Sequence, residues 1–306
     1  MVTKRIIVSM ATIPSRKERL LENLPAILNQ SYYFDKLIIN ITDNLSDDDY
    51  EFYDSLTKKD DRISINRAEA KWRSCNKLLP TIKSHPEDVI ITIDDDIYYP
   101  KHCFKYLVEQ YEKTPNCVIA HEINPLLLDE ETGYISFYNG RDIKLMQKEW
   151  GKYLSGCALF PPHIFDGTDL FDYDKMMKCT NAVNDELWFW INSTLNGIMV
   201  VGLNYVSSFA LDVITPWEKE EFRLANFNNS NEKLNSYMKV INEMYGERLL
   251  KQINNRPAIF TLDKDNVYSF MLIFKLVKKY YGNHWQIVTK DLTKGWLVEL
   301  KERIKE

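Results

Sequence analysis

The sequence predicts an α/β protein with a mostly parallel central sheet flanked by helices. Short runs of β-branched apolar residues alternate with longer segments of helical periodicity from the N-terminus to Ile93. Such alternation is typical of β-α-β units, whose parallel strands are joined by right-handed crossovers. The run Val89–Ile93 also leads directly into three aspartates. Ligands of open α/β sheets bind at the carboxyl ends of strands, so this run marks the expected site.

Composition restricts the class of protein further. The chain has 306 residues, of which 45% are hydrophobic, which is enough for a large buried core. Its net charge of -5 argues against a nucleic-acid binder. The five cysteines show no CxxC spacing, so we expect neither a zinc site nor a disulfide framework, and a reducing cytosol fits best. We expect no signal peptide, and no apolar run approaches the ~18 residues of a membrane span.

The first predicted unit is a strand, a turn and a helix. Residues 5–10 form the strand, and Ser15 with Glu18 three residues later is a capping-box pattern for the helix that follows. Free backbone N–H groups at such a helix start favour anionic ligands, and Arg16 adds a guanidinium fork suited to phosphate. Arg16 is equally compatible with an ordinary surface position in the first helical turn.

Two more strands precede the aspartates, at residues 36–41 and 63–66. Asp43 follows the first of them, where a carboxylate can accept hydrogen bonds from a base or ribose, although a single residue there is more often a turn former. We expect one helix from Ala68 to Lys83 before the Val89–Ile93 strand. Neither GxGxxG nor GxxxxGK[ST] is present, so the usual dinucleotide and P-loop fingerprints are absent.

Asp94, Asp95 and Asp96 follow the apolar strand without interruption. Adjacent carboxylates repel one another and are costly to bury unpaired. A hard divalent cation relieves that repulsion and commonly bridges to phosphates. The alternative is a solvated acidic turn.

The second part of the chain is less regular. We expect a helix at 101–112, strands at 117–120, 134–138, 153–162 and 198–203, and an apolar helix beginning near Asn181 that Asn184 or Asp185 would cap. Gly156 lies within one strand and marks either close backbone approach to a ligand or a bulge. A polar, Asn-rich segment at 213–235 is expected to form a flap.

The C-terminal segment 251–306 differs in charge, with eleven Lys and Arg against six Asp and Glu. We expect a basic, aromatic helix at 268–281 in a helical extension. It is compatible with packing on its own domain, which we favour, or with peripheral contact through 267–281 at the inner face of an anionic membrane. The expected domains are thus 1–250, with halves 1–123 and 124–250, and the extension 251–306.

Three features together resemble the GT-A fold glycosyltransferases that use nucleotide sugars. They are the Thr12–Arg16 turn, the strand ending in Asp94-Asp95-Asp96 and the Asn184-Asp185-Glu186 helix start. The resemblance is greatest to bacterial family-2-like enzymes of surface-polysaccharide synthesis and covers roughly Lys4 to Tyr205. It implies a cytoplasmic hexosyl- or N-acetylhexosaminyl-transferase that moves a sugar from a UDP-sugar to a glycan or lipid-linked acceptor.

The resemblance also implies a role for each site residue. Asp94 and Asp96 would hold Mn²⁺ or Mg²⁺ on the donor diphosphate, and Glu186 would be the general base, with Asp185 as its neighbour or substitute. The remaining assignments are nucleotide contacts by Thr12, Pro14, Arg16, Asp43, Arg73, Lys77, Asp94 and Asp95, and acceptor or sugar contacts by Gly156 and Trp188.

The sequence is compatible with more than one base, stereochemical outcome and activity. The pair reads Asp-Glu where the family more often has Glu-Asp, which leaves the identity of the base open. Residues 76–80 are similar to the region before DDD in exostosin-type enzymes, which retain anomeric configuration. We favour inversion. A nucleotidyltransferase and a non-catalytic sugar-binding relative are the other candidates.

Overall fold

The computed structural model describes residues 4–121, 123–124, 126–129, 132–137, 146–149, 151–153, 156–203, 231–254, 259–263, 285–292 and 295–302. Most of the flap expected at 213–235 and the whole of the helix expected at 268–281 lie outside these ranges, as does the membrane contact expected through 267–281. The domain boundaries stay predictions.

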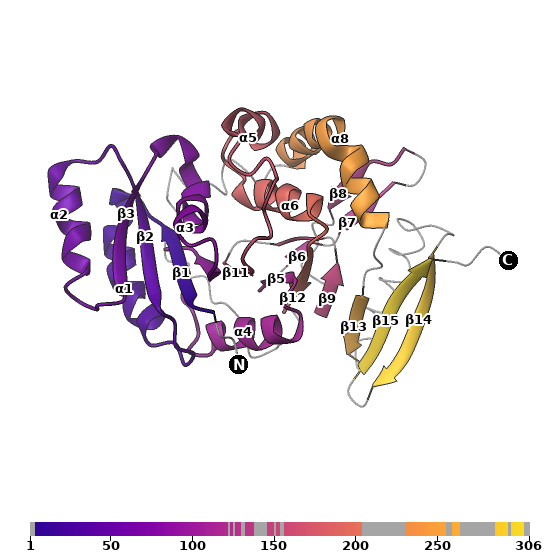
Figure 1. Ribbon diagram of the computed structural model, residues 1–306, viewed down its shortest axis with the longest axis horizontal. Coiled ribbons are helices and arrows are strands. Elements are labelled where there is room, and N and C mark those ends of the chain that lie inside the picture. Colours follow the sequence, from indigo (N-terminus) through magenta and orange to yellow (C-terminus); the bar gives the residue numbers. More distant parts are fainter. Residues whose placement is uncertain are drawn as a thin grey trace.

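One eleven-stranded sheet runs through the described part of the chain, in the order β14-β15-β13-β9-β12-β5-β11-β4-β1-β2-β3 (Figure 1). Its strands are β1 Ile6–Ala11, β2 Lys36–Thr42, β3 Ile63–Ala68, β4 Val89–Ile93, β5 Cys117–Ala120, β9 Met146–Glu149, β11 Cys157–Phe160, β12 Met199–Gly202, β13 Ile259–Asp263, β14 Trp285–Leu292 and β15 Gly295–Glu302.

The four N-terminal strands of this sheet are parallel. β1 lies between β2 and β4, with Val8 opposite both Leu37 and Ile91, and β3 pairs with β2 on its far side. All five residues of β4 are buried, as expected of a β-branched run covered on both faces. The predicted α/β fold with a parallel sheet is therefore confirmed.

Helices connect and cover these strands (Figure 1). The helical elements are η1 Pro14–Arg16, α1 Lys17–Leu28, α2 Asp47–Leu56, η2 Ala70–Lys77, α3 Leu79–Ser84, α4 Cys103–Lys113, α5 Tyr173–Thr180, α6 Asp185–Leu195 and α8 Asn231–Asn254. The capping box predicted for Ser15 and Glu18 is wrong. Pro14 opens a short 3-10 turn, and the residue before α1 is Arg16, whose side chain makes no cap hydrogen bond.

The single helix predicted from Ala68 to Lys83 is also wrong. Ala68 ends β3, and the chain then forms η2 and α3, which are separated at Leu78. Within η2, Arg73 has φ 47° and ψ -124°, a combination that interrupts helical geometry. A non-glycine residue in this region is strained, so the surrounding structure must hold it there.

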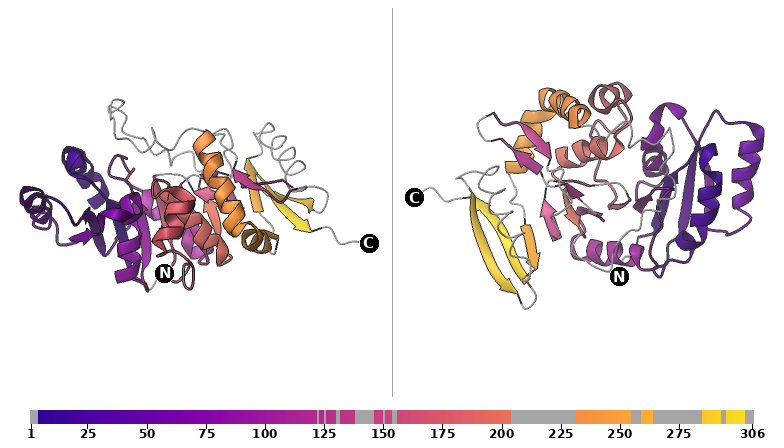
Figure 2. Two further views of the ribbon diagram at one scale, coloured as in Figure 1. Left: turned by 90° about the horizontal axis from the view of Figure 1, so that it is seen from above. Right: turned by 180° about the vertical axis from the view of Figure 1, so that it is seen from behind.

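The second part of the chain continues the same sheet. β11 lies antiparallel between β4 and β5, and β12 is parallel to β5. Two small sheets, β6 Ile123–Asn124 with β10 Lys152–Tyr153 and β7 Leu126–Leu128 with β8 Ile135–Phe137, complete this part. α8 packs on α5 and α6 (Figure 2). Asn184 caps α6 by accepting a hydrogen bond from the N–H of Leu187, which confirms one of the two predicted caps.

The described residues of the C-terminal segment correct the prediction of a helical extension. Here β13 pairs with β9, and β15 lies between β13 and β14, so this segment extends the central sheet. The run Trp285-Gln286-Ile287-Val288-Thr289 in β14 is rich in aromatic and β-branched residues, which are typical of a strand. Among the helices that the structure describes, none combines the length and apolar character needed to cross a membrane.

A buried polar network ties the parallel strands to the segment before β4. Asn40, at 1% exposure, donates from its amide to Ser9 Oγ and Thr81 Oγ1 and accepts from Asn66. Ser9 Oγ in turn donates to the carbonyl of Lys77 at 2.7 Å. The network therefore fixes the backbone position of Lys77 relative to β1 and β2.

We expect Asn40→Ala to lower the free energy of unfolding by about 1–3 kcal/mol, because it leaves buried polar partners without their hydrogen bonds. Urea unfolding of the purified protein measures this change. Asn44→Ala, at an exposed position after β2, is the matched control and should change it little. Equal unfolding midpoints for the two variants would contradict the structural role of Asn40.

Candidate active site

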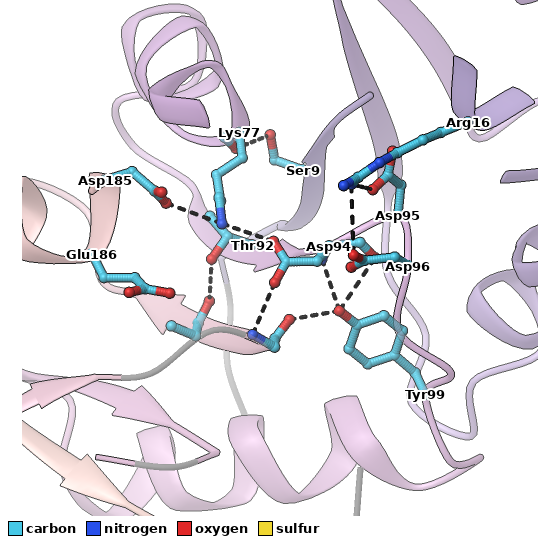
Figure 3. A network of polar contacts seen from close by, with 12 residues as sticks. Ser9, Arg16, Lys77, Thr92, Asp94, Asp95, Asp96, Tyr99, Asp185 and Glu186 are labelled. Atoms are coloured by element: carbon cyan, nitrogen blue, oxygen red, sulfur yellow. Dashed lines mark hydrogen bonds and ion pairs between the residues drawn. The ribbon is translucent and has the colours of Figure 1, made fainter. Parts of the chain in front are cut away.

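The three consecutive aspartates at the carboxyl end of β4 occupy different environments (Figure 3). The Asp95 side chain is 2% exposed, whereas those of Asp94 and Asp96 are 19% and 22% exposed. The triplet is therefore not a solvated acidic turn: each carboxylate has a defined orientation and its own neighbours.

Asp95 is held by the turn that follows β1. Its carboxylate accepts a hydrogen bond from Thr12 Oγ1 at 2.7 Å and pairs with the Arg16 guanidinium, which also lies 3.7 Å from Asp96. Asn23 of α1 donates to the Asp95 carbonyl. Burial raises the pKa of Asp95 to about 6, although the positive charge of Arg16 opposes this shift. Asp95 thus links the first turn to the end of β4.

Asp94 is held from the other side. Its two carboxylate oxygens bind Lys77 Nζ at 2.7 Å and the backbone N–H of Gly156 at 2.9 Å. The Tyr99 hydroxyl accepts from the Asp94 N–H and donates to the Gly156 carbonyl. Gly156 has φ 125°, a conformation that L side chains rarely adopt, so this backbone position favours glycine.

Lys77 joins the aspartate triplet to the start of α6. Its ammonium group lies 2.7 Å from Asp94 and 3.0 Å from Asp185. The contact with Asp185 Oδ2 is an ion pair without hydrogen-bond geometry. Burial by itself lowers the pKa of Lys77, but the carboxylates of Asp185, Asp94 and Glu186 outweigh it and raise the pKa well above its usual value. Lys77 is therefore a fixed positive charge between two acidic groups.

Glu186 has a different partner. Its Oε2 atom lies 3.2 Å from Lys152 Nζ, and its side chain is 18% exposed. Burial raises the pKa of Glu186, the charge of Lys152 opposes this shift, and Asp185 adds to it. A carboxylate with a raised pKa is a better proton acceptor than an ordinary one. Burial also raises the pKa of Asp94 and of Asp95, but protein donors bind both carboxylates, so Glu186 is the candidate general base of this site.

The residues present are compatible with a divalent cation shared with a diphosphate. Each Asp94 oxygen already accepts a hydrogen bond from a protein group, and the Asp95 carboxylate accepts hydrogen bonds from Thr12 and Arg16. Asp96 has the most exposed carboxylate of the three. No cluster of three His, Cys, Asp or Glu side chains arranged for a metal occurs among the described residues. Mg²⁺ usually needs only one or two carboxylates when phosphates supply other ligands, and Asp96 with Asp94 fits that arrangement.

Many residues that the sequence singled out do lie together here. They are Thr12, Arg16, Lys77, Asp94, Asp95, Asp96, Gly156, Asp185 and Glu186, which come from five separate segments. Figure 3 labels all of them except Thr12 and Gly156. Pro14 is half-buried at the start of η1. Asp43 is exposed and accepts a hydrogen bond from the backbone N–H of Ala70, and Arg73, which is itself the strained residue of η2, is exposed. The nucleotide contacts assigned to these residues stay predictions.

The sugar or acceptor contact predicted for Trp188 is wrong. Its side chain is fully buried in α6, and the indole N–H donates to the carbonyl of Leu170 at 2.9 Å. It has no exposed surface on which a sugar ring could stack. Trp188 belongs to the hydrophobic core.

Sequence reasoning missed Lys152, Tyr99 and Asn23. Asn23 had a usable signal, because it falls on the apolar face of α1 between Leu20 and Ile27, where a polar residue needs a buried partner. Lys152 and Tyr99 gave no comparable signal. Their partners Glu186 and Gly156 lie 34 and 57 residues away, so only the folded chain brings them together.

Comparison with known proteins agrees with this geometry. Residues 11–157, just under half of the chain, match the family described as Glycosyl transferase family 2. The matched stretch includes Thr12, Lys77, the aspartate triplet and Gly156. The resemblance to family-2-like glycosyltransferases is thereby confirmed for this part of the chain. No curated protein matches the chain.

Solved structures with distant similarity include S. aureus TarS. The TarS 1–349 structure aligns with a TM-score of 0.42 and 14% identity over 65% of this chain and 58% of that chain. Its complex with UDP gives 0.43 and 13% over 65% and 58%, and its complex with UDP-GlcNAc gives 0.42 and 14% over 65% and 56%. The alignment thus spans just over half the length of these TarS structures.

We expect Tyr99→Phe to destabilise the protein by about 1–3 kcal/mol, because the Gly156 carbonyl and the Asp94 N–H both lose their buried partner. Urea unfolding measures the change. Tyr98→Phe is the matched control, since the Tyr98 side chain is 46% exposed beside it. The link between Asp94 and Gly156 through Tyr99 is contradicted if both variants unfold like the wild type.

Proposed function

We propose that this protein is a metal-dependent glycosyltransferase that moves a sugar from a nucleotide sugar, with UDP as the nucleotide, to a hydroxyl of a glycan or lipid-linked acceptor. The observation that carries the proposal is the carboxylate cluster at the end of β4, joined through Lys77 to the acidic start of α6. The family match over residues 11–157 supports glycosyl transfer as the reaction class.

The donor would bind on the Thr12 and Arg16 side of the cluster. The turn after β1 presents the start of η1 beside Asp95, and Arg16 supplies a positive charge near Asp96. A diphosphate there would meet the Arg16 guanidinium, whose planar fork matches phosphate oxygens. The Asp95 side chain is only 2% exposed and is bound by Thr12 and Arg16, so it would shape this subsite without serving as a metal ligand.

Asp96 and Asp94 would hold Mn²⁺ or Mg²⁺ at the donor diphosphate. When bound, the cation offsets the negative charge that develops on the leaving nucleoside diphosphate. Lys77 already binds one oxygen of Asp94, and Gly156 binds the other, so both keep this carboxylate oriented. Asp96 is the ligand that the protein leaves most accessible.

Glu186 would accept the proton of the attacking hydroxyl. As the acceptor oxygen forms its bond to the sugar C1, the O–H proton passes to the Glu186 carboxylate. The bond from C1 to the phosphate oxygen breaks, and its electron pair leaves with the nucleoside diphosphate. Attack from the face opposite the leaving group inverts the anomeric centre.

The structure favours Glu186 over Asp185 for this step. Asp185 is 5% exposed, and its Oδ2 atom faces the Lys77 ammonium group. Glu186 is more exposed, and burial raises its pKa. We therefore assign proton transfer to Glu186 and the orientation of Lys77 to Asp185.

Asp96→Asn tests the metal assignment through binding. The wild type should gain thermal stability with UDP only when Mn²⁺ is present, because ligand binding to the native state raises the apparent melting temperature. The variant should lose this Mn²⁺-dependent shift. GDP and CDP serve as comparison nucleotides. An undiminished Mn²⁺-dependent shift in the variant would exclude Asp96 as a ligand, and no shift with any nucleotide in the wild type would argue for a non-catalytic protein.

Glu186→Gln tests the base. The amide keeps the size of the side chain but cannot accept the proton, so transfer should fall by about 10²–10⁴-fold while the UDP shift stays intact. Release of UDP from UDP-sugars and the anomeric configuration of the product by NMR are the measurements. Asp185→Asn is the comparison variant. If Asp185→Asn abolishes transfer and Glu186→Gln does not, the base is Asp185.

A further inference from the structure

Lys152 is a buried lysine beside the proposed base. It is 4% exposed as a residue and lies on β10, which pairs with β6 through Lys152 and Asn124. Its ammonium group is 3.2 Å from Glu186 Oε2. A buried ammonium group is unfavourable unless it is paired, so this contact is a requirement of the site and not an incidental surface pair.

Lys152 lies close in the sequence to a residue that binds Asp94. Lys152 precedes Gly156 by four residues, and the N–H of Gly156 binds Asp94. β10 also packs against α6, the helix that begins at Asp185 and carries Glu186 in its first turn. Lys152 thus contacts the Glu186 carboxylate, and Gly156, four residues later, contacts the Asp94 carboxylate.

We propose that Lys152 is a positioning residue, whose ammonium group holds the Glu186 carboxylate in the orientation that receives the acceptor proton. This inference rests on the proposed role of Glu186 as the base. Lys152 makes no bond to the reacting sugar; it acts through Glu186. The neighbouring Asp185 has its own cation in Lys77, so the two adjacent carboxylates do not compete for one partner.

Several charged or titratable groups face Glu186 from different elements. Lys152 lies on β10, Asp185 on α6, Lys77 on η2 and Asp94 after β4. Tyr153, also on β10, is buried next to Asp185 and Glu186, and its hydroxyl has no hydrogen-bond partner among the described residues. Of these groups, Lys152 has the largest opposing effect on the pKa of Glu186. Removing it should therefore favour the protonated, inactive form.

The first test measures Glu186 directly and needs no substrate. ¹³C NMR of protein labelled at glutamate carboxyl carbons follows the titration, and the Glu186 signal is identified by its loss in Glu186→Gln. Lys152→Met should raise the Glu186 midpoint by about one pH unit or more, as removal of a close opposite charge does. Lys152→Arg should restore it. Lys175→Met removes an ion pair with Asp169 elsewhere and should leave it unchanged. An unchanged midpoint in folded Lys152→Met overturns the proposal.

The second test separates positioning from donor binding. With UDP-glucose or UDP-N-acetylglucosamine and Mn²⁺, Lys152→Met should lower kcat and move the acidic limb of its pH profile upward, with little change in donor KM. A raised donor KM with an unmoved limb would make Lys152 a donor ligand and overturn the proposal. If the wild type transfers no sugar, the proposed function fails and the catalytic role of Lys152 fails with it. If the wild type is active and only the limb stays in place, the inference about Lys152 alone is wrong.

Discussion

The pairing of buried acidic groups with buried cations at the end of β4 is the interaction on which the site depends. Five carboxylates and three cations gather there. The carboxylates are those of Asp94, Asp95, Asp96, Asp185 and Glu186, and the cations are Arg16, Lys77 and Lys152. Burying charged groups is unfavourable unless they are paired, so the cluster depends on close counter-charges. Among the described residues of this cluster, the carboxylates outnumber the cations.

The fold supplies the precision that these ion pairs need. The backbone of Lys77 is held in place, because Ser9 donates a hydrogen bond to its carbonyl and Asn40 donates one to Ser9. This restricts where the Lys77 ammonium group can lie. Tyr99 holds the backbones of Asp94 and Gly156 together in the same way. Buried hydrogen bonds of this kind are costly to leave unmade, so the parallel strands and the site are stabilised by one connected set of contacts.

The sequence predicted what depends on local pattern. The β-branched run before Asp94 could hardly be anything but a buried strand, and its three aspartates had to lie at the carboxyl end of the sheet. Tertiary context decided the rest. The backbone conformation of Arg73 interrupts the single helix that we expected there. Trp188 is fully buried and therefore lies in the core and not in the site. Lys152 could not be assigned from sequence, because an isolated lysine shows no partner until the fold brings Glu186 to it.

The two lysines explain how adjacent carboxylates on one helix turn can differ in chemistry. Asp185 faces Lys77, which is also bound to Asp94 at the end of β4. Glu186 instead faces Lys152, which lies on β10. Consecutive residues at a helix start point in directions about 100° apart, so two separate cations can reach them. One carboxylate then stabilises the site, and its neighbour is left in an environment suited to accepting a proton.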